Sequence, residues 1–212
     1  MKTLYLFDLD GTLLDTLQDL ADATNHVLRQ NGYPTRTVEE VRSILGNGAR
    51  CQLQRSLPAG VSDEELDRLL DQYRDYYEAN CQNHTRPYDG IEPLLESLRQ
   101  QGARIAVLSN KPDGATKRLC ARYFPGISAQ GQTDTVRRKP APDGVLALLR
   151  QFDCSVEDAV YVGDSEVDLQ TAENCGMDSI LCTWGFRSRQ QLLEAGARVI
   201  VDTPAEILAL YR

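Results

Sequence analysis

The sequence predicts an α/β protein with a doubly wound parallel sheet and a small all-helical domain inserted after the first strand. A short apolar run from Leu4 to Phe7 is typical of a buried parallel strand. Residues 16–80 then show only helical spacing of apolar side chains, and beyond residue 87 apolar runs alternate with helical patterns, which indicates βαβ units. We therefore expect a core domain of residues 1–15 and 86–212 and a helical domain of residues 16–85.

The inserted block carries start and stop signals for four helices. The first begins near Asp15 or Thr16 and ends before Gly32. A capping-box pattern, Thr37 with Glu40, predicts a second short helix, and a third is expected over residues 49–57. The fourth begins after residue 62 and carries a stripe of leucine and tyrosine side chains, which we expect to be core.

The rest of the chain alternates strands with helices. Helices are expected around residues 94–101, 115–123, 143–150 and 166–175 and after residue 203, and strands near 3–8, 103–108, 127–130, 159–162, 180–182 and 199–201.

Composition limits the classes of partner. The 212 residues carry a net charge of −8, which disfavours nucleic acid and anionic membranes because both attract basic surfaces. No apolar stretch approaches the roughly 20 residues of a membrane span, and Asp8 and Asp10 interrupt what would be a signal peptide. The six cysteines lack metal-binding spacing, so free thiols in a cytoplasmic protein are expected. We expect a monomer or weak homodimer.

Polar side chains follow three of the predicted strands. Asp8 and Asp10 follow the first, Ser109 and Asn110 another, and Asp164 a third, with Asp168 one helical turn later. Ligands bind outside the carboxyl ends of strands in open α/β sheets, so these groups are expected to meet at one edge.

Converging carboxylates would repel each other unless a cation joined them. An all-oxygen ligand set favours Mg²⁺ over zinc, and Lys139 adds a positive charge from its own loop. Carboxylates, magnesium, a lysine, a hydroxyl and an amide together are suited to phosphoryl transfer. One aspartate can then act as nucleophile and a second as general acid and base.

Four short motifs resemble those of the haloacid dehalogenase superfamily, in its phosphatase branch with a helical cap. The motifs are Phe7-Asp-Leu-Asp-Gly-Thr-Leu13, Leu108-Ser-Asn-Lys111, Lys139-Pro-Ala-Pro-Asp143 and Val162-Gly-Asp-Ser-Glu-Val-Asp168, and the resemblance covers the whole chain. It implies a Rossmann-like core, a cap domain, and a Mg²⁺-dependent phosphomonoester hydrolase that acts on a small phosphorylated metabolite through an aspartyl-phosphate.

The resemblance also implies roles for the matching residues. Asp8 would be the nucleophile and a metal ligand, and Asp10 the general acid and base, giving its backbone carbonyl to the metal. Asp164 would be the other protein ligand, with Asp168 behind it or reaching the metal through water. Ser109 and Asn110 would hold the phosphoryl group, and Lys139 would balance charge; as alternatives, Ser109 could cap a helix and Lys139 and Asp168 could be surface charges.

A glycine-rich stretch in the helical block is the candidate for substrate selection. Gly46, Asn47 and Arg50 lie where a helix begins, and backbone amides and an arginine suit a carboxylate. This stretch and Trp184-Gly-Phe186 resemble bacterial phosphoglycolate phosphatases, so 2-phosphoglycolate is the expected substrate. The alternative for the stretch is a connecting turn with a solvent-facing arginine.

Other functions stay open at this stage. A phosphomutase of the β-phosphoglucomutase type would use the same chemistry but return the phosphoryl group to a sugar. A dehalogenase is disfavoured because Asp10 is present. A phosphate-binding or regulatory module without catalysis is disfavoured because no catalytic position is visibly lost.

Overall fold

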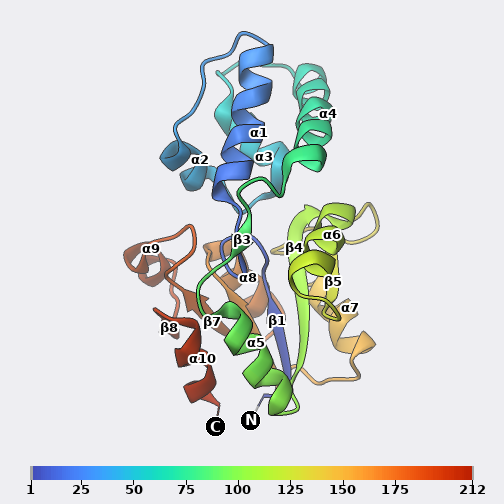
Figure 1. Cartoon of the computed structure of the whole chain (residues 1–212), viewed down its shortest axis with the longest axis vertical. Helices are drawn as coiled ribbons and strands as arrows, with labels where there is room; N and C mark the ends of the chain where they lie inside the picture. The colour runs from blue at the N-terminus through green and yellow to red at the C-terminus, as the bar shows by residue number, and fades with distance from the viewer. Residues whose placement is uncertain (1, 212) are drawn as a thin grey trace. The chain divides into compact units, whose positions relative to one another are not determined.

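The computed structural model describes residues 2–211, which form two compact units. The core unit comprises Met1–Leu14 and Pro87–Arg212, and the helical unit comprises Asp15–Arg86. The chain therefore leaves the core unit after its first strand and returns to it about seventy residues later (Figure 1).

The core unit is built on a six-stranded sheet in the order β5-β4-β1-β6-β7-β8, and each neighbouring pair is parallel. The strands are β1 (Leu4–Phe7), β4 (Arg104–Pro112), β5 (Ser128–Gln132), β6 (Ala159–Gly163), β7 (Asp178–Cys182) and β8 (Ile200–Val201). The order places the first strand in the centre, so every side chain of β1 is buried. The parallel α/β sheet predicted from the sequence is confirmed.

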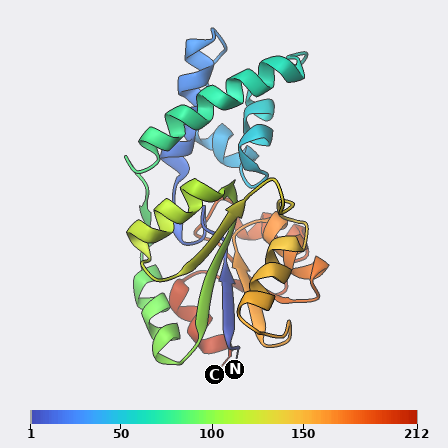
Figure 2. The same ribbon diagram turned by 90° about the vertical axis from the view of Figure 1, so that its right-hand side faces the viewer.

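Helices cover both faces of this sheet. They are α5 (Ile91–Gln100), α6 (Asp113–Tyr123), α7 (Asp143–Gln151), α8 (Glu166–Asn174), α9 (Arg189–Glu194) and α10 (Pro204–Leu210). Figure 2 shows α5 and α10 on one face and α7 and α8 on the other.

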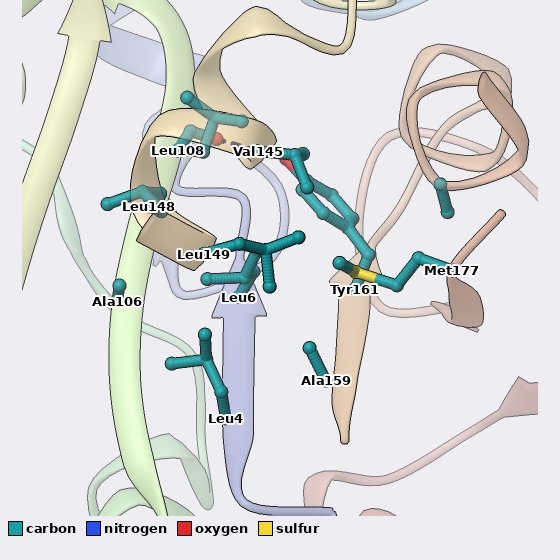
Figure 3. Packing of buried hydrophobic residues seen from close by; sticks show 11 residues of the cluster. Leu4, Leu6, Ala106, Leu108, Val145, Leu148, Leu149, Ala159, Tyr161 and Met177 are labelled. Atoms are coloured by element: carbon teal, nitrogen blue, oxygen red, sulfur yellow. Dashed lines mark hydrogen bonds between the residues drawn. The ribbon is translucent and has the colours of Figure 1, made fainter. Parts of the chain in front are cut away.

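On the face covered by α7, apolar side chains from three strands pack together. Leu6 of β1, Leu108 of β4 and Tyr161 of β6 meet Val145 and Leu149 from α7 (Figure 3). All five are less than a tenth exposed. This dry layer holds the three central strands in register beneath the edge at which they end.

The register of the sheet decides which polar residues meet. Phe7 at the end of β1 pairs with Val107 of β4 and with Val162 of β6. The next residue, Asp8, donates its backbone N–H to the carbonyl of Val162 over 2.9 Å. The residues that follow β1 and β6 therefore converge at one edge with the last residues of β4.

The helical unit contains α1 (Leu17–Gln30), α2 (Val38–Ile44), α3 (Gly48–Ser56) and α4 (Asp63–Asn80). The predicted capping box of Thr37 and Glu40 is present, and Ser62 caps α4 by accepting from the backbone N–H of Glu65. Tyr73 and Tyr77 of α4 are buried, as expected for core residues.

Two short strands, β2 (Leu14–Asp15) and β3 (Arg86–Pro87), pair where the chain passes between the units. Within the helical unit, the buried carboxylate of Asp19 accepts from the backbone N–H groups of His84 and Thr85 and from the Thr85 hydroxyl. Asp19 thereby anchors the returning segment to α1.

Four elements differ from the sequence prediction. Strands β2 and β3 have no counterpart in it, because each is two residues long and too short to show alternation. Strand β4 continues to Pro112 rather than ending near residue 108, because its register with β5 shifts after Leu108 and pairing resumes between Pro112 and Gln132. Helix α9 has no counterpart in the prediction: it is six residues long and buries only Leu192, which is too little to show periodicity. Among residues 2–211, no helix is both long and apolar enough to cross a membrane.

Candidate active site

The first carboxylate lies directly after β1. Asp8 is 9% exposed, and its Oδ1 accepts from the backbone N–H of Leu9 over 2.7 Å and from the ammonium group of Lys139 over 2.9 Å. Burial, together with the nearby carboxylates of Asp168 and Asp10, raises the pKa of Asp8 to about 7 against the lowering effect of Lys139. Asp8 is therefore a carboxylate that needs further positive charge to stay ionised.

Lys139 reaches the site from the loop before α7. Its Nζ lies 2.9 Å from Asp8 Oδ1 and 2.7 Å from Asp168 Oδ1, and 5.5 Å from the centre of the Tyr161 ring. Burial alone would lower the pKa of Lys139, but the two carboxylates outweigh it and hold the pKa above its usual value. The ammonium group therefore stays positively charged next to the Asp8 carboxylate.

Asp164 follows β6 and lies between two glycines. A Cβ on Gly11 would stand 2.4 Å from Asp164 Oδ2, and one on Gly185 would stand 2.5 Å from the same oxygen. Gly11 also has a φ of +82°, which other residues rarely adopt. Oδ1 of Asp164 accepts from the Thr12 hydroxyl over 3.2 Å, and Oδ2 accepts from the backbone N–H of Phe186 over 2.7 Å.

Burial and the neighbouring carboxylates of Asp168 and Asp8 raise the pKa of Asp164 well above its usual value. The pKa values of Asp8 and Asp164 are therefore raised for the same reasons, since each carboxylate is buried and lies near other carboxylates.

Asp168 lies in the first turn of α8, and both of its oxygens have partners. Oδ1 binds Lys139, while Oδ2 accepts from the backbone N–H groups of Asp164 and Ser165 and from the Ser165 hydroxyl. This is a capping box with Ser165 at the start of the helix. Asp168 thus joins Lys139 to the Asp164 loop, which favours a supporting role over direct contact with a metal.

Asp10 is paired with a lysine that the sequence reasoning had given no role. Its Oδ1 lies 3.0 Å from Nζ of Lys111, whose side chain is only 3% exposed, whereas that of Asp10 is 18% exposed. The Asp10 carboxylate is therefore paired with a residue of β4.

Ser109 and Asn110 both lie at the carboxyl end of β4, as the motif requires. The Ser109 hydroxyl accepts from the backbone N–H of Lys111 over 3.2 Å. The Asn110 side chain accepts from the backbone N–H of Lys139 over 2.7 Å and donates to its carbonyl over 3.1 Å. Asn110 thereby holds the loop that presents Lys139, a role the sequence alone did not suggest.

The residues fit a divalent cation bound by oxygen. Asp8, Asp164 and Asp168 offer carboxylate oxygens that lie within 4.8 Å of one another. Burial and the neighbouring carboxylates raise the pKa values of Asp8 and Asp164, so a bound cation would favour their ionised forms. A hard cation with oxygen ligands, such as Mg²⁺, matches both the donors and the charge.

Three further predicted site residues lie in the helical unit, as expected from the sequence. Gly46 and Asn47 precede α3, and Arg50 lies in its first turn. The guanidinium of Arg50 is bound by Asp67 through Nε over 3.0 Å and by Asp63 through Nη2 over 2.9 Å. A substrate carboxylate would have to compete with these two side chains.

Several site residues escaped the sequence reasoning: Thr12, Lys111, Glu166, Phe186 and Arg187. Thr12, Lys111 and Glu166 stood inside the quoted motifs, and Phe186 inside the quoted Trp184-Gly-Phe186, so their positions were visible although their partners were not. The N–H of Phe186 is a backbone donor, which no residue pattern reveals. Glu166 and Arg187, a partly buried ion pair, are 21 residues apart in sequence.

Fold and site together define a class: a parallel α/β protein with an aspartate, a lysine and further carboxylates that could hold a cation at the edge of the sheet. The chain matches the family model for haloacid dehalogenase-like hydrolases over residues 5–182. It belongs to that family.

Similar proteins agree with this placement. Phosphoglycolate phosphatase 1 of Pseudomonas aeruginosa is 31% identical, over 98% of this chain and 79% of the relative. Phosphoglycolate phosphatase of Agrobacterium fabrum is 30% identical, over 95% of this chain and 89% of its own. A crystal structure from Lactobacillus delbrueckii subsp. bulgaricus, provisionally named phosphoglycolate phosphatase, superposes with a TM-score of 0.92 at 37% identity, covering 98% of this chain and 97% of that one.

Proposed function

We propose that the protein is a Mg²⁺-dependent phosphomonoester hydrolase that works through an aspartyl-phosphate on Asp8. The observation that carries the proposal is the convergence of Asp8, Lys139 and Asp164 at the carboxyl edge of the sheet in a member of a hydrolase family. The names of the relatives agree with phosphatase activity.

In the first half-reaction, a carboxylate oxygen of Asp8 attacks phosphorus, and the bond from phosphorus to the ester oxygen breaks. Lys139, held 2.9 Å from Asp8, offsets negative charge at the nucleophile and on the phosphoryl group. Asp10 donates a proton to the leaving oxygen, so the alcohol departs neutral. Asp10 leaves its pairing with Lys111 for this step.

In the second half-reaction, the acyl phosphate on Asp8 is hydrolysed. Asp10, now a carboxylate, takes a proton from water, and the water oxygen attacks phosphorus. The bond between phosphorus and the Asp8 oxygen breaks, which releases inorganic phosphate and restores the Asp8 carboxylate.

The metal would be held by Asp8 and Asp164, with the backbone carbonyl of Asp10 as a further ligand. When bound, it supplies positive charge that stabilises the phosphoryl oxygens. Thr12 and the backbone N–H of Phe186 hold the Asp164 carboxylate for this role, one donor on each oxygen.

We propose 2-phosphoglycolate as substrate, because the curated relatives carry that name over nearly the whole chain. Gly46, Asn47 and Arg50 are the candidates for recognising its carboxylate, with Arg50 leaving Asp63 and Asp67 to do so. A cytoplasmic location agrees with the six free thiols.

The test is a release assay for inorganic phosphate with 2-phosphoglycolate, other phosphorylated acids and sugar phosphates, with and without Mg²⁺. Turnover that requires Mg²⁺ and disappears in Asp8→Asn is expected. Isomerised sugar phosphate without free phosphate would identify a mutase instead. Arg50→Ala should raise KM for 2-phosphoglycolate but not for ethyl phosphate, which lacks the carboxylate; equal effects on both would remove Arg50 from recognition.

A further inference from the structure

A segment distant in sequence, Trp184–Arg187, contacts the carboxylate site, and we name it the brace. The Trp184 indole Nε1–H donates to the carbonyl of Thr12 over 3.0 Å. Gly185 packs so closely that an added Cβ would stand 2.3 Å from the Gly11 carbonyl oxygen. The N–H of Phe186 donates to Asp164 Oδ2 over 2.7 Å. Each of these contacts falls on the Asp10–Thr12 loop or on Asp164.

The last residue of the brace makes a charged contact. Arg187 binds Glu166 with two parallel bonds, Nε to Oε2 over 2.8 Å and Nη2 to Oε1 over 3.0 Å. The Arg187 side chain is 8% exposed and that of Glu166 is 39% exposed. This is the two-point geometry that a guanidinium forms with a carboxylate and that lysine cannot reproduce.

The two contacts close a small ring around Asp164. Glu166 is two residues after Asp164, and Arg187 follows Phe186 directly. The ion pair therefore links the same two segments, residues 164–166 and 186–187, as the hydrogen bond from the Phe186 N–H to Asp164 Oδ2. If the pair is lost, residues 164–166 and 186–187 can separate, and the N–H that orients Asp164 Oδ2 can withdraw.

We propose that Glu166 and Arg187 are positioning residues for the cation site. They act through the hydrogen bond from the Phe186 N–H to the Asp164 carboxylate. This inference rests on the metal role proposed for Asp164. Groups that orient a metal ligand commonly change metal affinity by about 10–100-fold when removed. Neither side chain has a part in the two half-reactions.

Charge alone predicts a different pattern. Loss of the Arg187 charge near the carboxylates would strengthen cation binding, and loss of the Glu166 charge would weaken it. Positioning predicts that both losses weaken binding, and that the double loss is no worse than one, because either change breaks the same link. A structural role alone would lower stability without changing cation affinity.

The experiment measures Mg²⁺ binding to the metal-free protein by calorimetry for wild type, Glu166→Gln, Arg187→Met and the double variant. We expect each single change to raise the Mg²⁺ Kd roughly 10-fold and the double change to raise it no further. Arg187→Lys keeps the charge but cannot form the two parallel hydrogen bonds to Glu166, so it should behave like Arg187→Met. The matched control is Arg189→Met, which breaks the exposed pair with Asp202 (2.8 Å) and should leave the Kd unchanged.

Unchanged Kd values in folded variants, opposite signs for the two single changes, or a wild-type Kd in Arg187→Lys would each overturn the inference. Circular dichroism and urea denaturation establish folding. If Arg187→Met does not fold, Arg187→Lys decides, because it keeps the charge and only positioning predicts a higher Kd for it. A wild type that binds no Mg²⁺ would refute the metal site of the proposed function and this inference with it. A wild type that binds Mg²⁺ with unaffected variants would refute the inference alone.

Discussion

Replacing Asp8, the proposed nucleophile, should stabilise the metal-free protein. The pKa of Asp8 is raised to about 7, chiefly by burial, whereas an aspartate in an unfolded chain has a pKa of about 3.9. At about 1.4 kcal/mol for each pKa unit, the ionised Asp8 carboxylate costs the metal-free protein about 4 kcal/mol at pH 8. Asp8→Asn keeps the volume and removes the charge, so its free energy of unfolding should rise by up to about 4 kcal/mol.

The sign of the pH dependence follows from the raised pKa. The protonated Asp8 is favoured in the folded state, so its contribution to stability is fully present below about pH 4 and is lost as the pH rises through about 7. The advantage of Asp8→Asn over wild type should therefore be absent near pH 4, grow up to about pH 7, and level off above it.

The assay is urea denaturation in EDTA, followed by the fluorescence of Trp184, the single tryptophan, which lies in the core unit. Asp202→Asn is the control of opposite sign, because the hydrogen bond from Arg189 lowers the pKa of Asp202, and its loss should reduce stability slightly. An Asp8→Asn variant less stable than wild type at pH 8, or a difference independent of pH, would refute the reasoning.

Three further outcomes are expected. Asp10→Asn should slow hydrolysis of alkyl phosphates by about 10²–10⁴-fold and affect p-nitrophenyl phosphate far less, since that leaving group needs no proton; equal losses would contradict the acid role. Gly185→Ala should weaken Mg²⁺ binding in calorimetry, because its Cβ would stand 2.5 Å from Asp164 Oδ2, and wild-type affinity would show that the close approach is unimportant. The rise in Tm on adding Mg²⁺ should be larger at pH 8 than at pH 5.5, because the raised pKa values of Asp8 and Asp164 let protons compete with the cation; equal shifts would exclude this competition.

The site could be predicted from sequence where a strand end determines position. Asp8 and Asp164 each follow a fully buried strand, and parallel neighbours bring their carboxyl ends to one edge whatever the loops do. The apolar runs that form those strands were visible in the sequence, so the convergence of the two carboxylates followed from periodicity and from the predicted parallel sheet.

Partners of long side chains could not be predicted in the same way. Lys111 was visible beside Ser109 and Asn110, but its ion pair with Asp10 depends on how far β4 extends past residue 108. Asn110 shows the same limit, because its amide binds the backbone of Lys139, 29 residues away, through a loop whose path no pattern encodes.

The central claim is that Asp8 carries the phosphoryl group during turnover, and trapping that intermediate tests it most directly. Acid-quenched enzyme from a reaction with 2-phosphoglycolate and Mg²⁺ would be reduced with borohydride, which converts an acyl phosphate to an alcohol, and digested for mass spectrometry. We expect homoserine at position 8 in wild type and none without substrate. Unmodified Asp8 throughout steady turnover, together with phosphate release by Asp8→Asn, would contradict it.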